Sequence, residues 1–479
     1  MSFHSTEEET LKAVLVGITV GRTSESETQE SLNELARLVN TLGYEVVGRM
    51  SQRRTSTRTA AVLGDGKLAE LAKWTGGTGV VSYYVNPKKH KASQRADWKQ
   101  NGTEDEDDIF EIDEEPFAPQ EAEDFVEEEN PQERAQLVIF DCDLSPSQMK
   151  NIEGATGAKV LDRTGVIIEI FSRHARTRAA RLQVEIARLT YVAPRMRALG
   201  GDDDRQGGGG KGVGESSVEL DRRKIRDRIK ELKQEFNSIG QEHLTRRARR
   251  EQEACVALVG YTNAGKSSLM RAMTGSEIYV ADKLFATLDT TVRAIQPETR
   301  PKILLSDTVG FIKKLPHDLV ASFKSTLDEA LNASLLLYVV DASDPSFRSQ
   351  FEVTKTTLAE VGAGETPSIM LLNKRDNLTD EEATALQAEF PDAILMSTRN
   401  PQDIVDLRER LVKFFENTMR EEEILIPYTV QGVIGDIRAR LRVLAENYDE
   451  KGVRLTIRAN VEDLEKIKKK IKDILADQY

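Results

Sequence analysis

The stretch Gly260-Tyr261-Thr262-Asn263-Ala264-Gly265-Lys266-Ser267 decides the fold of the central part of this chain. It follows an apolar run, Ala254 to Val259, and precedes Ser268 to Met273, whose composition is that of a helix. A strand, a glycine-containing loop and a helix with this spacing form a phosphate-binding loop. The loop N–H groups and the helix N-terminus then face a polyphosphate, Lys266 reaches its β- and γ-phosphates, and Ser267 ligates Mg²⁺. The alternative is a glycine-rich turn between a strand and a helix that binds nothing.

Later segments repeat the pattern of an apolar strand followed by polar residues. Lys302 to Ser306 leads into Asp307-Thr308-Val309-Gly310, and Leu335 to Val340 ends at Asp341. An Asp at the end of a strand, such as Asp307, can hold Mg²⁺ through water. A glycine in contact with phosphate lets its loop sense the γ-phosphate.

A third segment of this kind indicates which base is bound. Ser368 to Leu372 leads into Asn373-Lys374-Arg375-Asp376. The Asp376 carboxylate can accept hydrogen bonds from guanine N1–H and the exocyclic amine, whereas adenine has an acceptor at N1 and would leave a buried charge unpaired. The next strand, Ala393 to Ser397, brings the backbone of Ser397-Thr398-Arg399 near guanine O6. The order of these motifs predicts a P-loop GTPase domain of the α/β class, with a mostly parallel sheet and helices on both faces.

A mobile threonine that closes on Mg²⁺ and the γ-phosphate is expected between the first two motifs. The segment Leu284 to Thr291 offers Thr287, Thr290 and Thr291, and spacing alone does not choose among them.

The position directly after Gly310 limits the chemistry. Many GTPases place a glutamine there to orient the attacking water, but this chain has Phe311. Because Phe311 can neither donate nor accept a hydrogen bond, we expect slow intrinsic hydrolysis, or water positioned by a partner or by the switch backbone.

Length and composition describe a charge-rich chain of several domains. A prior of ~150 residues per domain suggests about three domains for its 479 residues. The chain has no run of 18 apolar residues, so we expect no membrane span. The polar segment Met1 to Thr10 lacks the apolar core of a signal peptide. We therefore expect a cytoplasmic protein, in which Cys142 and Cys255 are reduced core residues. The five histidines are scattered and predict no metal cluster.

The acidic charge is concentrated in one segment. Thr103 to Glu129 holds 15 acidic residues and no Lys or Arg, which exceeds the net charge of −13. The remainder is about neutral and has basic clusters, so the overall charge does not exclude a nucleic-acid partner. We expect residues 86–131 to be a largely disordered insertion. It is either a solvated surface insertion, which we favour, or an acidic segment that guards a basic surface.

Alternating strands and helices predict a small parallel sheet in the N-terminal part. The expected strands are Ala13–Val20, Tyr44–Arg49, Gly79–Val85, Leu137–Asp141 and Lys159–Asp162. The expected helices are Glu25–Leu42, Gly64–Ala72 and one that begins near Ser145.

Two antiparallel helices joined by a glycine-rich loop are expected next. Their ranges are Arg181 to Leu199 and Glu215 to Arg250, and the loop is 200–214. The loop is either a flexible linker or backbone that approaches a phosphate-rich surface. Basic clusters favour contact with RNA, and the candidate residues are Arg205, Lys211, Arg246, Arg247, Arg249 and Arg250.

The C-terminal part reads as strand, helix, strand and helix. The expected ranges are Ile424–Tyr428, Val430–Asn447, Val453–Ala459 and Val461–Leu475. Ile434, Ile437, Leu441 and Leu444 would form one apolar helix face. This predicts a small α/β appendage.

Across nearly its whole length the chain resembles the HflX family of GTPases, in the Obg–HflX group of translation factors. The motifs GYTNAGKSSL, FATLD, DTVGF and NKRD match that family. So do LGDGKLAEL, DLSPSQMKNIE, VLDRTGVIIEIFSRHARTRAARLQVEIARLTYVAPRM and VELDRRKIRDRI, which generic GTPases lack. The family's glycine-rich loop usually continues as GPGE, where this chain has Gly212-Val213-Gly214-Glu215. In the GTPase domain, family members often have Ser-Ala where this chain has Ser397-Thr398. The acidic insertion is not typical of the family.

The resemblance implies site roles. It selects Thr287 as the switch threonine, so that Ser267 and Thr287 ligate Mg²⁺ directly and Asp307 does so through water, with Lys266, Thr287 and Gly310 as catalytic residues. The expected nucleotide-binding residues, for GTP or GDP, are Gly260, Tyr261, Thr262, Asn263, Ala264, Gly265, Lys266, Ser267, Ser268, Phe285, Ala286, Thr287, Leu288, Asp289, Asp307, Thr308, Val309, Gly310, Asn373, Lys374, Asp376, Ser397, Thr398 and Arg399.

The resemblance also implies a partner. Such proteins dock on the large ribosomal subunit and split stalled or idle ribosomes in the GTP state, with rRNA contacts from the N-terminal domain and the helical pair. Some members also bind ATP through the N-terminal domain, but no phosphate-loop signature lies between Ala13 and Gly79 here. A large-subunit assembly factor and a non-ribosomal, GTP-switched RNA-binding protein stay open as alternatives.

The expected domains are an N-terminal α/β domain with the insertion, the helical pair, the GTPase domain and the C-terminal appendage. Their ranges are 1–175, 176–250, 251–420 and 421–479. No heptad pattern stands out, so we expect a monomer.

Overall fold

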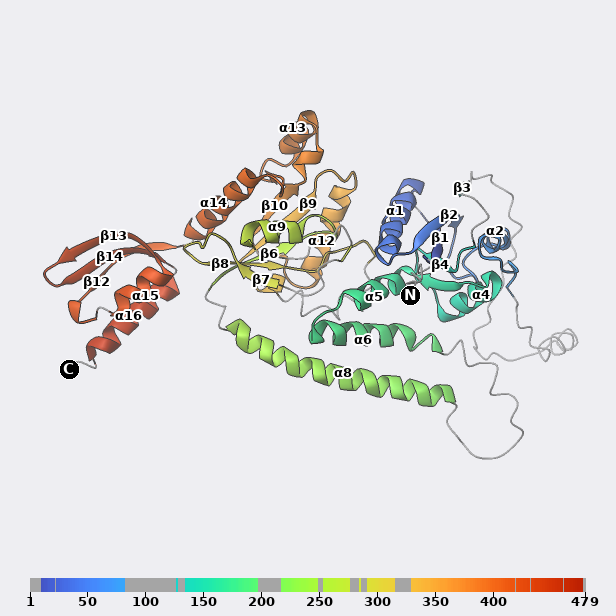
Figure 1. Ribbon diagram of the computed structural model, residues 1–479, viewed down its shortest axis with the longest axis horizontal. Helices are drawn as coiled ribbons and strands as arrows, with labels where there is room; N and C mark the ends of the chain where they lie inside the picture. The colour runs from blue at the N-terminus through green and yellow to red at the C-terminus, as the bar shows by residue number, and fades with distance from the viewer. Residues whose placement is uncertain are drawn as a thin grey trace, which may run out of the picture. The chain divides into compact units, whose positions relative to one another are not determined.

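The computed structural model (Figure 1) describes most of the chain in separate stretches. They are residues 10–21, 23–81, 126–127, 134–196, 217–248, 253–275, 284–285, 291–314, 329–417, 419–430, 432–459 and 461–476. The chain divides into two compact units. One comprises Met1–Ile167 with Ala193–Glu219, and the other comprises Ile168–Val192 with Leu220–Tyr479. The domain boundaries expected from the sequence stay a prediction.

The first unit contains a sheet in the order β3-β2-β1-β4-β5 among its described residues. Its strands are β1 (Lys12–Val20), β2 (Glu45–Arg54), β3 (Val126–Glu127), β4 (Leu137–Phe140) and β5 (Lys159–Asp162). Its helices are α1 (Glu25–Thr41), α2 (Asp65–Thr75), α4 (Pro146–Thr156) and the start of α5 (Arg163–His174). All neighbouring strands pair in parallel except β2 and β3, which pair antiparallel. The small parallel sheet expected here is confirmed.

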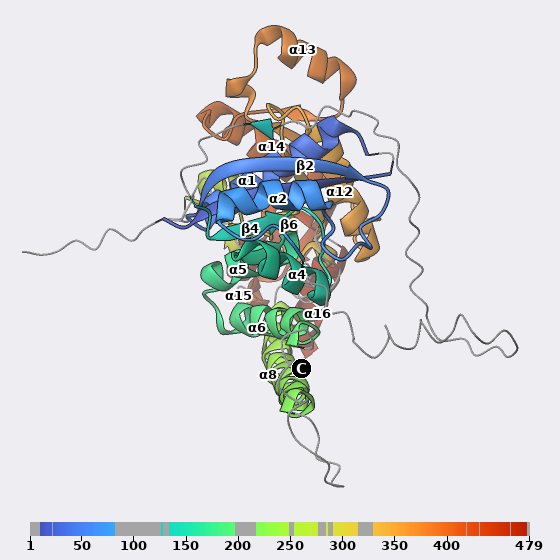
Figure 2. The same cartoon turned by 90° about the vertical axis from the view of Figure 1, so that its right-hand side faces the viewer.

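Glycines let helices approach both faces of this sheet. A Cβ on Gly17 of β1 would lie 2.9 Å from Leu32 of α1, and one on Gly48 of β2 would lie 2.9 Å from the Trp74 ring of α2. Figure 2 shows α2 and α4 in front of the strands, whereas α1 lies behind them. The start of α1 is fixed by a capping box, in which Ser24 and Glu27 each accept a backbone hydrogen bond from the other.

Two expectations for this unit need correction. The described part of the strand expected at Gly79–Val85, residues 79–81, is not a strand, and 82–85 lie outside the described residues. Gly79 has φ +70° and donates its N–H to the Ala155 carbonyl in α4. A left-handed residue bonded to a helix cannot continue a sheet ladder. The sequence also did not indicate α5, whose apolar residues include the β-branched Val166, Ile167 and Ile168.

After the end of α5, the second unit contains two antiparallel helices, α6 (Arg178–Val192) and most of α8 (Ser217–Ala248). Leu182 and Ile186 of α6 pack with the fully buried Leu232 of α8. Two ion pairs show the antiparallel direction, with Arg178 2.6 Å from Glu235 and Arg228 3.4 Å from Glu185. The expected helical pair is therefore present. The glycine-rich loop 200–214, and the acidic insertion apart from β3, lie outside the described residues.

A six-stranded sheet in the order β11-β10-β9-β6-β8-β7 forms the centre of the second unit, as far as its residues are described. Its strands are β6 (Ala254–Val259), β7 (Thr291–Ala294), β8 (Ile303–Asp307), β9 (Leu335–Asp341), β10 (Ser368–Asn373) and β11 (Ile394–Leu395). The helices are α9 (Lys266–Thr274), α12 (Phe347–Glu360), α13 (Asp380–Glu389), α14 (Pro401–Asn417) and the 3-10 turn η2 (Arg375–Asn377). All pairs are parallel except β7 with β8 at the edge.

Helices cover both faces of this sheet (Figure 1). One hydrophobic cluster joins Leu269 of α9 and Leu407 of α14 to the strands, and a second joins Phe347 of α12 and Leu386 of α13 to them. The α/β class and the doubly covered, mostly parallel sheet are therefore confirmed.

The C-terminal part forms an antiparallel sheet in the order β12-β14-β13. Its elements are β12 (Arg420–Ile426), the 3-10 turn η3 (Tyr428–Val430), α15 (Gly432–Arg440), β13 (Arg442–Asp449), β14 (Gly452–Ala459) and α16 (Val461–Ala476).

The helix expected over Val430–Asn447 is wrong in its second half, because α15 ends at Arg440 and a strand follows. Val443 pairs with Ile457 of β14, and Leu444 at the irregularity in this ladder is 39% exposed. Pairing with β14 overrides the helical spacing of the local sequence.

Among the helices that the structure describes, there is no candidate for a membrane span.

A buried arginine links two elements of the first unit. Arg163 is 2% exposed, and its guanidinium donates to Asp141 at the end of β4, at 2.6 Å, and to Glu34 of α1. Asp141 is itself 3% exposed. Removing one partner of a buried ion pair leaves an uncompensated charge and costs about 3–5 kcal/mol.

We expect Arg163→Met to lower the local free energy of unfolding of α1 and β4 by about 3–5 kcal/mol, measured by hydrogen exchange and mass spectrometry. The control is Arg173→Met in the same helix, since Arg173 pairs with Glu169 at an exposed site, where such pairs contribute about 0–1 kcal/mol. Equal protection of α1 and β4 in the two variants would contradict the prediction.

Candidate functional site

The loop between β6 and α9 has space for glycine alone at both of its ends. Gly260 has φ +152°, and a Cβ there would lie 2.2 Å from the Val339 carbonyl oxygen. Gly265 has φ +100°, and a Cβ there would lie 2.2 Å from Asn373 Nδ2. The loop therefore packs tightly against β9 and the end of β10, and α9 begins directly after it at Lys266. This is the strand–loop–helix arrangement of a phosphate-binding loop.

The Lys266 ammonium is held under the loop backbone. Its Nζ donates to the carbonyl oxygens of Gly260, at 3.0 Å, and Tyr261, at 2.7 Å, and the residue is 6% exposed. Burial lowers the pKa of Lys266 to about 8, and the negative charge of Asp307 opposes this shift. An adjacent polyphosphate would favour the charged form of Lys266, as any nearby negative charge does.

Two oxygen ligands for a cation meet beside Lys266. The Ser267 hydroxyl donates to Asp307 Oδ2 at 2.7 Å, because Asp307 ends β8, the strand next to β6. Mg²⁺ is usually held by one or two protein oxygens together with phosphate oxygens and water, and this pair fits that requirement. Within the described residues there is no cluster of three or more His, Cys, Asp or Glu that could hold a metal without such a ligand.

The segment after Asp307 lies on the phosphate loop. The Thr308 hydroxyl donates to the Leu258 carbonyl at 2.7 Å and fixes the start of the segment. A Cβ on Gly310 would lie 2.8 Å from Thr262 Cγ2 and 3.2 Å from Lys266 Nζ, so Gly310 borders the lysine ammonium. Phe311 is 3% exposed. At the position where many GTPases have a water-orienting glutamine, this chain therefore has a buried phenylalanine ring.

The residues expected to read the base lie together at the ends of β10 and β11. Asn373 donates from Nδ2 to the Ala264 carbonyl at 2.8 Å, and its Oδ1 accepts the Thr398 N–H at 3.1 Å. One amide therefore joins the phosphate loop to the segment after β11. Asp376 accepts hydrogen bonds from the Ser397 hydroxyl, at 2.6 Å, and from Arg399, at 3.0 Å.

The charge of Asp376 is stabilised by these neighbours. The hydrogen bond from the Ser397 hydroxyl is the largest cause that lowers the pKa of Asp376, and the Arg399 guanidinium adds to it, whereas partial burial opposes them. The carboxylate stays ionised, which is the form that can accept two hydrogen bonds from guanine.

Sequence reasoning did not assign a role to Asp341, which ends β9. Lys374 has φ +63°, and its Nζ donates to Asp341 Oδ2 at 2.6 Å. Asp341 Oδ1 in turn accepts from the Ser343 N–H, at 3.1 Å, and from the Ser343 hydroxyl, at 2.6 Å. Its position in the sequence could have indicated this role, because Asp341 ends β9, the strand beside the one that leads into Asn373-Lys374-Arg375-Asp376.

Of the expected nucleotide-binding residues 285–289, the structure describes Phe285, and of the three candidate switch threonines it describes Thr291, which begins β7. Phe285 has φ +56°, is 3% exposed, and packs edge-on against Phe171 of α5 with 4.7 Å between the ring centroids. Ala286, Thr287, Leu288 and Asp289 lie outside the described residues.

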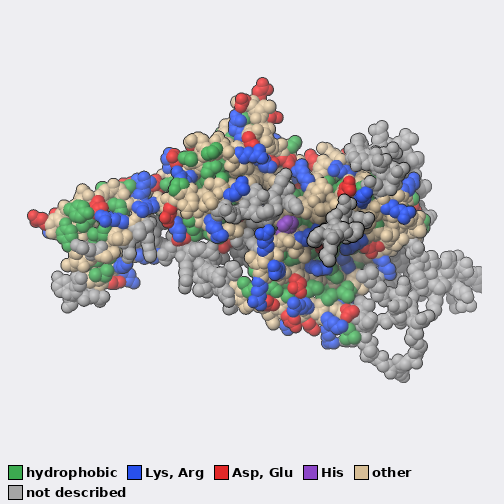
Figure 3. All heavy atoms as spheres, viewed as in Figure 1, with side chains coloured by type: hydrophobic (Ala, Val, Ile, Leu, Met, Phe, Trp, Pro, Cys, Tyr) green, Lys and Arg blue, Asp and Glu red, His purple; other side chains and the backbone are tan. Residues whose placement is uncertain are grey.

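The candidate rRNA contacts are also outside the description. Arg205, Lys211, Arg249 and Arg250 are not described, and neither are the side chains of Arg246 and Arg247 in α8. Along the described part of α8, exposed basic residues such as Lys224 and Lys230 alternate with acidic ones such as Asp227 and Glu231. Figure 3 shows this mixture of basic and acidic side chains in the region where Figure 1 labels α6 and α8.

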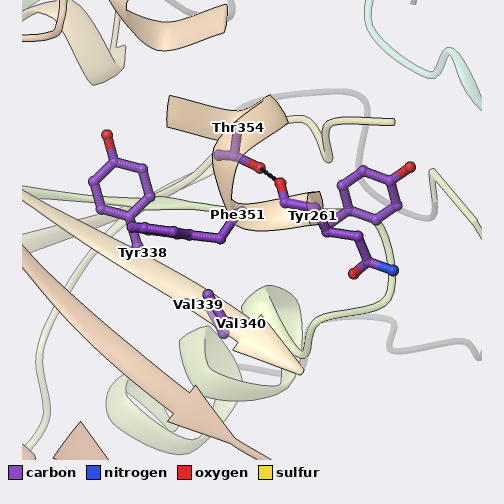
Figure 4. A pocket seen from close by; sticks show the side chains of 8 residues that line it. Tyr261, Tyr338, Val339, Val340, Phe351 and Thr354 are labelled. Atoms are coloured by element: carbon purple, nitrogen blue, oxygen red, sulfur yellow. Dashed lines mark hydrogen bonds between the residues drawn. The ribbon is translucent and has the colours of Figure 1, made fainter. Parts of the chain in front are cut away.

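A small apolar pocket lies behind the phosphate loop (Figure 4). Gly260 and Tyr261 line it together with the β9 residues 338–340 and with Gln350, Phe351 and Thr354 of α12. The Tyr338 and Phe351 rings pack edge-on in it, 5.3 Å apart. Lys266, Ser267, Asp307 and Asp376 do not line this pocket, so it is not the place for a polyphosphate.

Three protein families match successive parts of the chain. Residues 29–100 with 119–172 match the family described as "GTP-binding GTPase N-terminal", and residues 174–250 match "GTP-binding GTPase Middle Region". Residues 255–374 match "50S ribosome-binding GTPase".

Relatives match the chain over most of its length. GTPase HflX of Gluconacetobacter diazotrophicus is 55% identical over 447 residues, covering 93% of this chain and 95% of the relative. GTPase HflX of Caldanaerobacter subterraneus subsp. tengcongensis is 35% identical over 461 residues, covering 95% and 93%. A crystal structure of a GTP-binding protein from Sulfolobus solfataricus in complex with GDP shares 21% identity and a TM-score of 0.41, covering 85% of this chain and 100% of that one. Because the two HflX relatives match more than nine tenths of the chain at 55% and 35% identity, the chain belongs to the HflX family of GTPases.

Proposed function

We propose that the protein binds GTP and GDP with Mg²⁺ at the loop Gly260 to Ser268, and that it hydrolyses GTP slowly when alone. The observation that carries this proposal is the meeting of Lys266, the Ser267–Asp307 pair and Asp376 around one loop. The phosphate side and the base side are joined by the Asn373 amide. Membership of a GTPase family supports the same reading.

Each part of the site has a defined task in this proposal. The loop N–H groups and the α9 N-terminus bind the phosphates, and Lys266 neutralises the β- and γ-phosphates. Mg²⁺ adds positive charge at the phosphates when bound. Ser267 and Thr287 would hold it directly, and Asp307 would hold it through water. The Gly310 backbone contacts the γ-phosphate. Phe311 offers no group to orient water, which accounts for a slow intrinsic rate.

We further propose that the protein binds the large ribosomal subunit and its rRNA, and splits stalled or idle ribosomes in the GTP state. The family matched by residues 255–374 is described as a 50S ribosome-binding GTPase, and the N-terminal and helical parts match the GTPase HflX relatives as well. In this proposal, the bound ribosome helps to orient the attacking water, which Phe311 cannot do, and thereby stimulates hydrolysis. GTP hydrolysis then resets the protein after splitting.

We expect Lys266→Ala to weaken GDP and GTP binding at least about 100-fold, since each hydrogen bond to a charged group contributes about 1.5–3 kcal/mol. Titration with a fluorescent guanine nucleotide measures this. Lys302→Ala is the control and should bind like the parent, because Lys302 lies just before β8 and pairs with Glu253, just before β6, near the surface. Retained affinity in Lys266→Ala would contradict the proposed site.

Asp376→Asn should shift the base preference from guanine to xanthine. The Asn amide can donate to the xanthine 2-oxygen but cannot accept from both guanine N–H groups. We expect GTP affinity to fall about tenfold or more and XTP affinity to rise, in a competition assay. Asp380→Asn, at a 93% exposed carboxylate, is the matched control. A variant that still prefers GTP over XTP as the parent does would rule out this role of Asp376.

Ribosome binding is tested by co-sedimentation with large subunits in a non-hydrolysable GTP analogue and in GDP. We expect retention in the analogue only, stimulation of GTP hydrolysis by ribosomes, and a fall in light scattering as ribosomes separate. Lys266→Ala should lose all three effects. Binding to precursor particles without splitting would indicate an assembly factor instead, and binding to free structured RNA alone would indicate a non-ribosomal role.

A further inference from the structure

The side chain of Tyr261 has a position that phosphate binding does not require. A phosphate loop acts through its backbone N–H groups, so the second residue of the loop needs no large side chain. Tyr261 is nevertheless 6% exposed, and its hydroxyl oxygen accepts the backbone N–H of Lys313 at 2.6 Å. Lys313 follows Gly310 by three residues, in the segment that senses the γ-phosphate.

Two backbone hydrogen bonds hold the same segment to the same loop. The Phe311 N–H donates to the Gly260 carbonyl at 3.1 Å, and the Phe311 carbonyl accepts the Thr262 N–H at 2.9 Å. Tyr261 and Phe311 thereby form an isolated parallel bridge. The tyrosine hydroxyl adds a third attachment, two residues further along.

These attachments determine where Gly310 lies. A Cβ on Gly310 would be 3.2 Å from Lys266 Nζ, so the Gly310 backbone borders the ammonium group proposed to bind the γ-phosphate. Lys266 itself is held by the Tyr261 carbonyl at 2.7 Å. One residue therefore holds the phosphate-binding lysine through its backbone and the γ-phosphate-sensing segment through its side chain.

We propose that Tyr261 is a positioning residue for GTP hydrolysis, whose hydroxyl anchors residues 311–313 so that the Gly310 backbone is already placed for the γ-phosphate. This inference rests on the proposed nucleotide function. Because residue 311 is a buried Phe, the segment has no side chain directly after Gly310 that can attach itself to the nucleotide. The hydroxyl of Tyr261 supplies the attachment from the loop side. GDP has no γ-phosphate, so its affinity does not depend on this anchor.

The same pocket contains a matched control. Tyr338 of β9 lines it together with Tyr261, and Figure 4 shows the Tyr261 ring extending away from the packed rings of Tyr338 and Phe351. Tyr338 is 7% exposed and packs on Phe351. Tyr261→Phe and Tyr338→Phe therefore make the same chemical change, removal of one hydroxyl, at two sites in one pocket.

The test measures three quantities for the parent and both variants without ribosomes. They are the single-turnover rate of GTP hydrolysis, the Kd for a non-hydrolysable GTP analogue and the Kd for GDP. Loss of one neutral hydrogen bond corresponds to about fivefold. We expect Tyr261→Phe to hydrolyse GTP about fivefold more slowly and to bind the analogue about fivefold more weakly, with the GDP Kd within twofold of the parent. Tyr338→Phe should match the parent in all three.

The outcomes separate the inference from the proposed function. A parent protein that neither binds nor hydrolyses GTP would overturn the proposed function and the inference with it. A parent that hydrolyses GTP, with Tyr261→Phe equal to Tyr338→Phe, would overturn the inference alone. Equal weakening of GDP and the analogue in Tyr261→Phe would also overturn it, because that result indicates a general packing role. The retained GDP affinity also shows that the variant is folded.

Discussion

The close packing of glycine backbone between neighbouring strand ends is the constraint on which the nucleotide site depends. Gly260 lies against the Val339 carbonyl, Gly265 against the Asn373 amide and Gly310 against Thr262. Each contact is too short to admit a Cβ. Parallel pairing places the carboxyl ends of β6, β8, β9 and β10 at one edge of the sheet, and the glycine contacts hold the loops close to that edge, where open α/β sheets bind ligands. The order of the strands then places phosphate and base groups on either side of one loop.

This packing also makes the site one connected unit. The Asn373 amide contacts the phosphate loop with one end and the segment after β11 with the other. Lys266 remains buried and is held by loop carbonyls, although burial lowers its pKa. A lysine kept in that position ahead of its ligand needs little rearrangement when a polyphosphate binds. Asp376 is likewise positioned in advance, because the Ser397 hydroxyl donates to its carboxylate and lowers its pKa.

Local patterns predicted much of this fold and failed where distant segments compete for the same residues. The buried strands were predictable because parallel strands covered on both faces are continuous apolar runs, as in β6 and β9. The sequence predicts helix where β13 lies, because the apolar spacing of Ile434 and Ile437 continues into Leu441 and Leu444. Pairing with β14 ended the helix at Arg440. The sequence also predicts a strand that begins at Gly79, but the Gly79 N–H donates to a carbonyl of α4 instead.

The motifs in the amino-acid sequence were sufficient to indicate a guanine-nucleotide site, since each motif is a short run whose chemistry depends on its own residues and on the strand before it. The attachments between motifs could not be derived that way. The contact of Tyr261 with Lys313 and that of Lys374 with Asp341 each join residues 52 or 33 positions apart. Such pairs depend on strand order and register, which long-range packing sets and no local pattern contains.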